Sequence, residues 1–201
     1  KDIHEQHMAP TTAATVTTAI KNADPEFVVC NLKKRYTGVS ATVNALVPVQ
    51  LTQWRLAYCG TLLSNGVQGM SLRQAIRLSK RAPEGRAFRI WHVRRDHEMM
   101  AGLWARDVLR LPIKLVFTSA AQHLHGRFPR WLIAKMDAVI STTPLAASFV
   151  PNTTPVVPHG IDLSRFSVPA DKAEAWTESC LTGYSGMRLF CLLRQCTGKD
   201  I

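Results

Sequence analysis

A histidine followed by two arginines is the cluster in this sequence best suited to chemistry. His92 lies near the carboxyl end of a predicted strand over 88–93, and Arg94 and Arg95 follow it. Open α/β sheets bind their ligands outside the carboxyl ends of the strands. A lone histidine at a strand end is usually structural, but the neighbouring arginines favour a ligand site. We therefore take His92 as the candidate catalytic residue and Arg94 as a substrate-binding candidate.

The loop after the first predicted strand is a second candidate, this time for an anion. Gly38 lies at the start of a predicted helix, in the stretch NLKKRYTGVSAT (31–42). A glycine there lets backbone N–H groups approach an anion closely. Lys33, Lys34 and Arg35 could hold phosphate, although such a run is more often a solvated face. No G-x-G-x-x-G or P-loop pattern accompanies Gly38, so a tight turn explains it equally well.

Two hydroxyl side chains end the predicted strand over 114–119. Thr118 and Ser119 are suited to binding the oxygens of a sugar or a phosphate. They could equally cap the following helix, which is the commoner use of such residues.

Apolar runs of strand length alternate with segments of helical period from residue 25 onward, which predicts βαβ units on a parallel sheet. The predicted fold class is therefore α/β, with a Rossmann-like parallel sheet and flanking helices. The expected strands are 26–31, 54–59, 88–93, 114–119, 137–142 and 155–159.

The clearest predicted helix covers residues 97–111 and ends before Pro112. Apolar residues recur in it at spacings of three and four, which favours a buried face. The residues expected in the core are Met100, Leu103, Trp104, Val108 and Leu111.

The balance of charge indicates an anionic partner. The 201 residues carry 25 Lys and Arg against 14 Asp and Glu, which gives a net charge of +11. Lipid headgroups, phosphorylated sugars and nucleic acid all fit that charge. The segment 71–89 is basic and has apolar residues along one side, so it could dock on an anionic inner leaflet or be a plain solvated helix.

Two further sequence features indicate the cellular compartment. The sequence contains no apolar run long enough for a transmembrane helix and no secretory h-region, so we expect a cytoplasmic protein, peripheral on the inner membrane if it touches one. The five cysteines show neither a C-x-x-C pair nor zinc spacing, and we expect free thiols and no bound metal or cofactor.

In combination, four stretches resemble the amino-terminal half of a family 4 retaining glycosyltransferase of the two-domain GT-B type. They are NLKKRYTGVSATV, RIWHVRRDHEMMAGLWARDVLRLPIKLVFTSAAQ, RWLIAKMDAVISTTPLAASFV and VPHGIDLSRF. Within that family they look most like the lipopolysaccharide core mannosyltransferases of α-proteobacteria. The resemblance implies transfer of mannose from a nucleotide sugar such as GDP-mannose to a lipopolysaccharide core acceptor, without a metal.

The resemblance also assigns roles to residues. By similarity, Gly38 faces the donor diphosphate and the acceptor, His92 contacts the transferred sugar, and Thr118 with Ser119 lines the acceptor side. Further positions match two family motifs, one at a strand end beside the cleft (Ser141 and Thr142) and one in the interdomain linker (His159, Gly160 and Asp162).

Composition at the start of the chain and the resemblance beyond it together divide the chain into three parts. We expect a loose leader over 1–24, an acceptor-binding Rossmann-like domain over 25–165, and a linker with a truncated or aberrant start of the donor-binding domain over 166–201. The tail CLTGYSGMRLFCLLRQCTGKDI lacks the family's Gly-Arg pair and its pair of glutamates. We therefore expect a non-native ending after about residue 179 and little or no transferase activity from this chain alone.

Two other functions stay open. A non-catalytic acceptor-binding remnant is the stronger alternative, and the absence of donor turnover would distinguish it from an enzyme. A basic nucleic-acid-binding protein would explain the charge, but the aromatic residues lie in apolar patterns and no nucleic-acid-binding motif is present.

Overall fold

Short strands alternate with helices along the chain. The computed structural model describes residues 24–63, 66–150, 153–158 and 160. Its elements in chain order are β1 (Phe27–Asn31), α2 (Gly38–Gln53), β2 (Leu56–Gly60), α3 (Leu72–Leu78), β3 (Arg89–Val93), α4 (Asp96–Leu103), the π-helical turn η1 (Trp104–Val108), β4 (Ile113–Ser119), α5 (Arg127–Ala134), β5 (Ala138–Ser141), α6 (Pro144–Ser148) and β6 (Thr153–Val156). No helix within the described ranges is long and apolar enough to cross a membrane.

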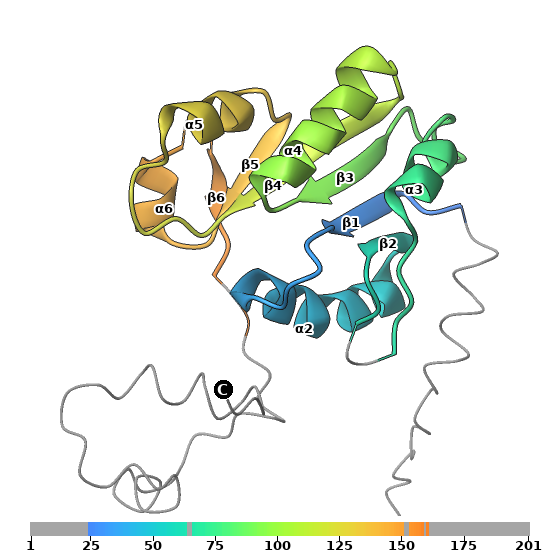
Figure 1. The fold of residues 1–201 in the computed structure, drawn as a ribbon, viewed down its shortest axis with the longest axis horizontal. Helices are drawn as coiled ribbons and strands as arrows, with labels where there is room; N and C mark the ends of the chain where they lie inside the picture. Colours follow the sequence, from blue (N-terminus) through green and yellow to red (C-terminus); the bar gives the residue numbers. More distant parts are fainter. Residues whose placement is uncertain (1–23, 64–65, 151–152, 159, 161–201) are drawn as a thin grey trace, which may run out of the picture. The chain divides into compact units, whose positions relative to one another are not determined.

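The strands form one parallel sheet in the order β2-β1-β3-β4-β5-β6 (Figure 1). The predicted α/β, Rossmann-like fold class is confirmed. From β1 the chain passes outward to β2 and returns to β3 on the other side of β1, so the direction of winding reverses between β1 and β3. Because the sheet is parallel, the carboxyl ends of all its strands lie at one edge.

Successive residues of β1 point to opposite faces of the sheet and enter two separate cores. Val28 and Cys30 lie in the larger core, which α3, α4 and α5 cover. Val29 lies in the smaller core with Val43 and Val47 of α2. Figure 1 shows α2 on one side of the sheet and α3 and α4 on the other. In the described chain, therefore, one face is covered by several helices and the other mainly by α2 over β1 and β2.

The predicted buried face of the helix over 97–111 is partly wrong. Leu103 is buried and Leu111 packs against the larger core, as expected. Met100, Trp104 and Val108 are instead 44%, 48% and 64% exposed. Their spacing of four residues marks the outer side of the helix.

Close packing explains which side of α4 faces the sheet. A Cβ on Gly102 would lie 2.7 Å from Leu115 Cδ2, so the glycine brings this side of the helix directly against β4. Met99 lies on the same buried side. The chain then widens into the π-helical turn η1, in which the Leu109 amide donates to the Trp104 carbonyl. This turn breaks the regular helical period on which the prediction rested.

The two cysteines of the described residues are free and buried, as expected. Cys30 of β1 and Cys59 of β2 are register partners across the parallel pair. The hydrogen bond to the Cys59 thiol, together with burial, raises the pKa of Cys30 well above its usual value.

Two glycines provide a test of this packing. A Cβ on Gly60 would lie 2.4 Å from the Asn31 carbonyl oxygen, a backbone atom, whereas nothing lies within 4 Å of a Cβ on Gly38. Urea unfolding of Gly60→Ala should show a loss of about 1–3 kcal/mol, the usual cost of overpacking. Gly38→Ala serves as the control and should be neutral or slightly stabilising. Equal stabilities would contradict the close approach of β1 and β2.

Candidate functional site

The candidate site lies at the carboxyl edge of the sheet around β1 and β3. Open α/β sheets bind ligands in the crevice where the winding direction reverses, and here that point is between these two strands. Asn31 ends β1, and Arg94 and Arg95 follow β3 directly. The structure therefore places the predicted arginines at the position that the topology favours for a ligand.

Arg95 joins this edge to the start of α2. Its Nη1 donates to Asn31 Oδ1 at 2.6 Å, and its Nη2 donates to Thr37 Oγ1 at 2.7 Å and to Ser40 Oγ at 3.1 Å. The side chain is only 12% exposed. Arg95 thus holds the end of β1 and the first turn of α2 in one fixed arrangement.

The buried carboxylate of Glu98 supports Arg95 from α4. The residue is 1% exposed. Its Oε1 accepts from the Leu32 amide at 3.1 Å and from Arg95 Nη1 at 3.2 Å, and its Oε2 accepts from the Arg94 amide at 2.9 Å. A buried charge is tolerated when it is paired and hydrogen-bonded in this way. Glu98 therefore fixes the backbone after both β1 and β3.

The start of α2 is open at this edge. Thr37 occupies the N-cap position but makes no capping hydrogen bond, because its hydroxyl accepts from Arg95 instead. Gly38 is exposed, with free space beside it. A helix start of this kind carries partial positive charge and can bind an anion.

Arg94 adds a second positive group beside the point where the winding direction reverses, between β1 and β3. Its Nη1 atom is buried and makes no hydrogen bond to any residue that the structure describes. Burial lowers the pKa of the guanidinium below its usual value, and the carboxylate of Glu98 opposes that shift.

His92 and Thr118 form a pair across β3 and β4. His92 Nε2 lies 2.6 Å from Thr118 Oγ1. Because side chains alternate along a strand, His92 points away from the core that holds Trp91 and Val93. Burial lowers the pKa of His92 from its usual 6.5 to about 3, with a smaller contribution from the charge of Arg94. The imidazole is therefore neutral at pH 7 and suited to hydrogen bonding rather than to acting as a cation.

The other predicted hydroxyl residues, Ser119, Ser141 and Thr142, are buried. Ser119 and Ser141 are register partners on β4 and β5, and Thr142 follows; these residues are 1%, 0% and 6% exposed. The hydroxyls of both serines lack a hydrogen-bond partner in the described structure. The structure thus brings Thr118 together with His92, while Ser119 points to the opposite, larger core. The binding roles of the two serines and Thr142 stay predictions.

Of the three predicted linker residues, the structure describes Gly160 alone. His159 and Asp162 lie outside the described residues. Gly160 is described and is exposed, and its predicted role also stays a prediction. Among the described residues, no group of three or more His, Cys, Asp and Glu side chains could hold a metal ion.

Sequence reasoning missed the residues that organise this edge. Asn31, Thr37, Ser40 and Glu98 were not among the candidates, although Asn31 is a polar residue at a strand end, the same signal that marked His92. The spacing of Arg95 and Glu98, three residues apart, was a signal for an ion pair on one helical turn. Nothing in the sequence pairs Glu98 with the Leu32 amide, which lies 66 positions away.

The low pKa of His92 predicts a specific pH dependence. The unfolded chain binds a proton on this residue below about pH 6.5, whereas the folded chain does not until about pH 3. Stability should therefore fall as the pH drops through this window, by up to about 1.4 kcal/mol per pH unit from this residue.

Nuclear magnetic resonance can follow the His92 ring directly, and urea unfolding can follow stability against pH. The ring signal should stay in its neutral position from pH 8 down to pH 5, and His92→Gln should flatten the corresponding part of the stability profile. A ring that titrates near pH 6.5 would show that the buried, neutral state is wrong.

Comparison with known proteins adds an independent observation. No family model matches the chain. The chain is 45% identical over 156 residues to the lipopolysaccharide core biosynthesis mannosyltransferase LpsB of Rhizobium meliloti (strain 1021), covering 76% of this chain and 43% of that protein. It is 36% identical over 179 residues to the lipopolysaccharide core biosynthesis mannosyltransferase LpcC of Rhizobium leguminosarum bv. viciae, covering 89% and 51%. The chain thus spans about half the length of the curated relatives it matches.

Proposed function

We propose that this chain is the acceptor-binding half of a retaining mannosyltransferase that acts in lipopolysaccharide core synthesis. The observation that carries the proposal is the similarity to LpsB and LpcC, which extends over most of this chain. The open carboxyl edge of the Rossmann-like sheet supports it, because that edge is where such a fold binds a ligand. The donor would be a nucleotide sugar, with GDP-mannose as the first candidate, and the acceptor the lipopolysaccharide core.

The groups at the carboxyl edge suit the charge that develops during such a transfer. As the bond between sugar and nucleotide breaks, negative charge builds on the leaving diphosphate, and fixed positive charge and oriented N–H groups stabilise it. In this proposal the open start of α2 at Gly38 and the guanidinium of Arg94 face that charge. Arg95 and Glu98 act as positioning residues, because they hold both elements in place through hydrogen bonds.

His92 would act on the sugar by hydrogen bonding. A neutral imidazole whose Nε2 is paired with Thr118 has a fixed orientation and can bind a hydroxyl group without adding positive charge. Orientation of this kind lowers the entropic cost of reaching the transition state. The proposal therefore places His92 against the transferred mannose and Thr118 beside it.

A chimaera tests the proposal, because the resemblance assigns donor binding to a second domain. The part of LpsB that aligns with residues 24–160 of this chain would be replaced by those residues, and transfer of radiolabelled mannose from GDP-mannose to core acceptor would be measured. The chimaera should transfer mannose, and His92→Ala within it should lower kcat at least about tenfold, equivalent to one lost interaction of about 1.4 kcal/mol in the transition state.

His123→Ala is the matched control, because His123 is exposed in the loop before α5. It should leave kcat unchanged. A folded chimaera that binds the core acceptor but gives no turnover would favour the non-catalytic remnant. A chimaera that binds no acceptor would refute the proposed function.

A further inference from the structure

Helix α5 exposes two aromatic rings to solvent. Phe128 and Trp131 are 53% and 55% exposed, and their rings stack with centroids 6.2 Å apart. The opposite side of the helix is occupied by Leu132 and Ile133, which are buried in the larger core. The fold of the described chain therefore uses only one side of α5, and the stacked rings are left on the other.

Positive charge surrounds these rings. Arg127 and Arg130 are exposed on the same helix, and Lys135 Nζ lies 5.9 Å from the centre of the Trp131 ring. Helix α5 contains no acidic residue. The carboxylate that follows it, Asp137, is already paired with Arg106 at 2.8 Å and Lys114 at 3.1 Å. We call Arg127, Phe128, Arg130, Trp131 and Lys135 the α5 surface.

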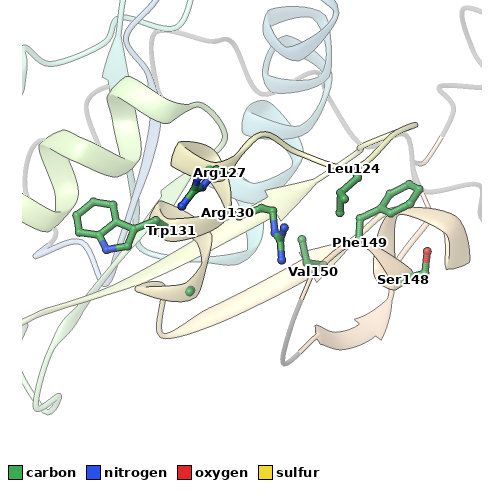
Figure 2. A pocket seen from close by; sticks show the side chains of 8 residues that line it. Leu124, Arg127, Arg130, Trp131, Ser148, Phe149 and Val150 are labelled. Atoms are coloured by element: carbon green, nitrogen blue, oxygen red, sulfur yellow. The ribbon is translucent and has the colours of Figure 1, made fainter.

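A groove of about 590 Å³ adjoins this surface. Figure 2 shows Arg127, Arg130 and Trp131 on the α5 side and Phe149 with Val150 on the other, with Leu124 close to Phe149. The residues that line the groove therefore combine cationic side chains with apolar ones. Helix α4 packs against α5, and Met100 of α4 and Trp104 of η1 are further exposed apolar residues.

The segment 71–89, the predicted membrane contact, exposes a single aromatic residue, Phe88, and has no stacked pair of rings. Leu72 and Ile76 of α3 pack against the larger core, so they are not available to a membrane. Arg89 is 1% exposed and donates to Asp24 and to three backbone carbonyls. Membrane docking of this segment therefore stays a prediction, and its apolar side is less available for it than the exposed rings of α5.

We propose that the α5 surface docks on an anionic membrane leaflet. Exposed tryptophan and phenylalanine side chains insert at the boundary between headgroups and acyl chains, while neighbouring arginine and lysine side chains bind the lipid phosphates. The inference rests on the proposed function, because a lipopolysaccharide acceptor is anchored in a membrane. Docking through α5 brings the chain to the surface that holds such an acceptor.

Vesicle binding tests this directly. The 201-residue chain would be sedimented with vesicles of phosphatidylcholine alone and of phosphatidylcholine mixed with phosphatidylglycerol. Binding is expected only to the mixed vesicles. Arg127→Gln with Arg130→Gln should weaken it about fivefold for each cation removed. Phe128→Ser with Trp131→Ser should also weaken it, at unchanged net charge.

Arg73→Gln with Arg77→Gln on α3 is the matched control, because it removes the same charge from an exposed site without aromatic residues. It should change binding by no more than about twofold. Circular dichroism would confirm that each variant is folded, which the exposure of all these side chains favours.

Three outcomes would overturn the inference. One is the absence of binding to mixed vesicles. Another is an equal loss in the α3 control, which would show that net charge alone drives binding. A third is self-association that only the aromatic variant abolishes, which would identify a second copy of the chain as the occupant. None of these assays involves mannose transfer. The vesicle result therefore decides this inference separately from the transfer experiment that tests the proposed function.

Discussion

The buried carboxylate of Glu98 is the constraint on which the candidate site depends. A carboxylate inside a protein is costly unless it is paired, and this one is satisfied by Arg95 and by the amides of Leu32 and Arg94. Those partners follow β1 and β3, the two strands between which the chain reverses its direction of winding. One side chain on α4 thereby fixes both halves of the candidate site.

The consequences extend outward from this carboxylate. Arg95, held by Glu98, donates a hydrogen bond to the Thr37 hydroxyl. The start of α2 therefore has no side-chain cap. On the next strand pair, His92 is kept neutral by burial and is oriented by Thr118. The edge therefore combines a fixed positive region with a neutral hydrogen-bonding group, an arrangement suited to an anionic leaving group beside a sugar.

The fold was readable from the sequence because each strand is a short apolar run and each connection a helical one. Local pattern could not fix which side of α4 faces the sheet, since that depends on the contact between Gly102 and Leu115 and on the π-helical turn. The position of His92 followed from the rule about strand ends. Its neutral state and the role of Glu98 did not, because both arise from contacts between residues far apart in the chain.

The stability of Glu98→Ala in urea tests the central claim most directly. Glu84→Ala is a matched control, because Glu84 is exposed. If Glu98 holds the edge together, Glu98→Ala should lose about 3–5 kcal/mol, since it leaves the Arg95 guanidinium unpaired in a largely buried position. The control should change by no more than about 0.5 kcal/mol. Equal effects in the two variants would contradict the account.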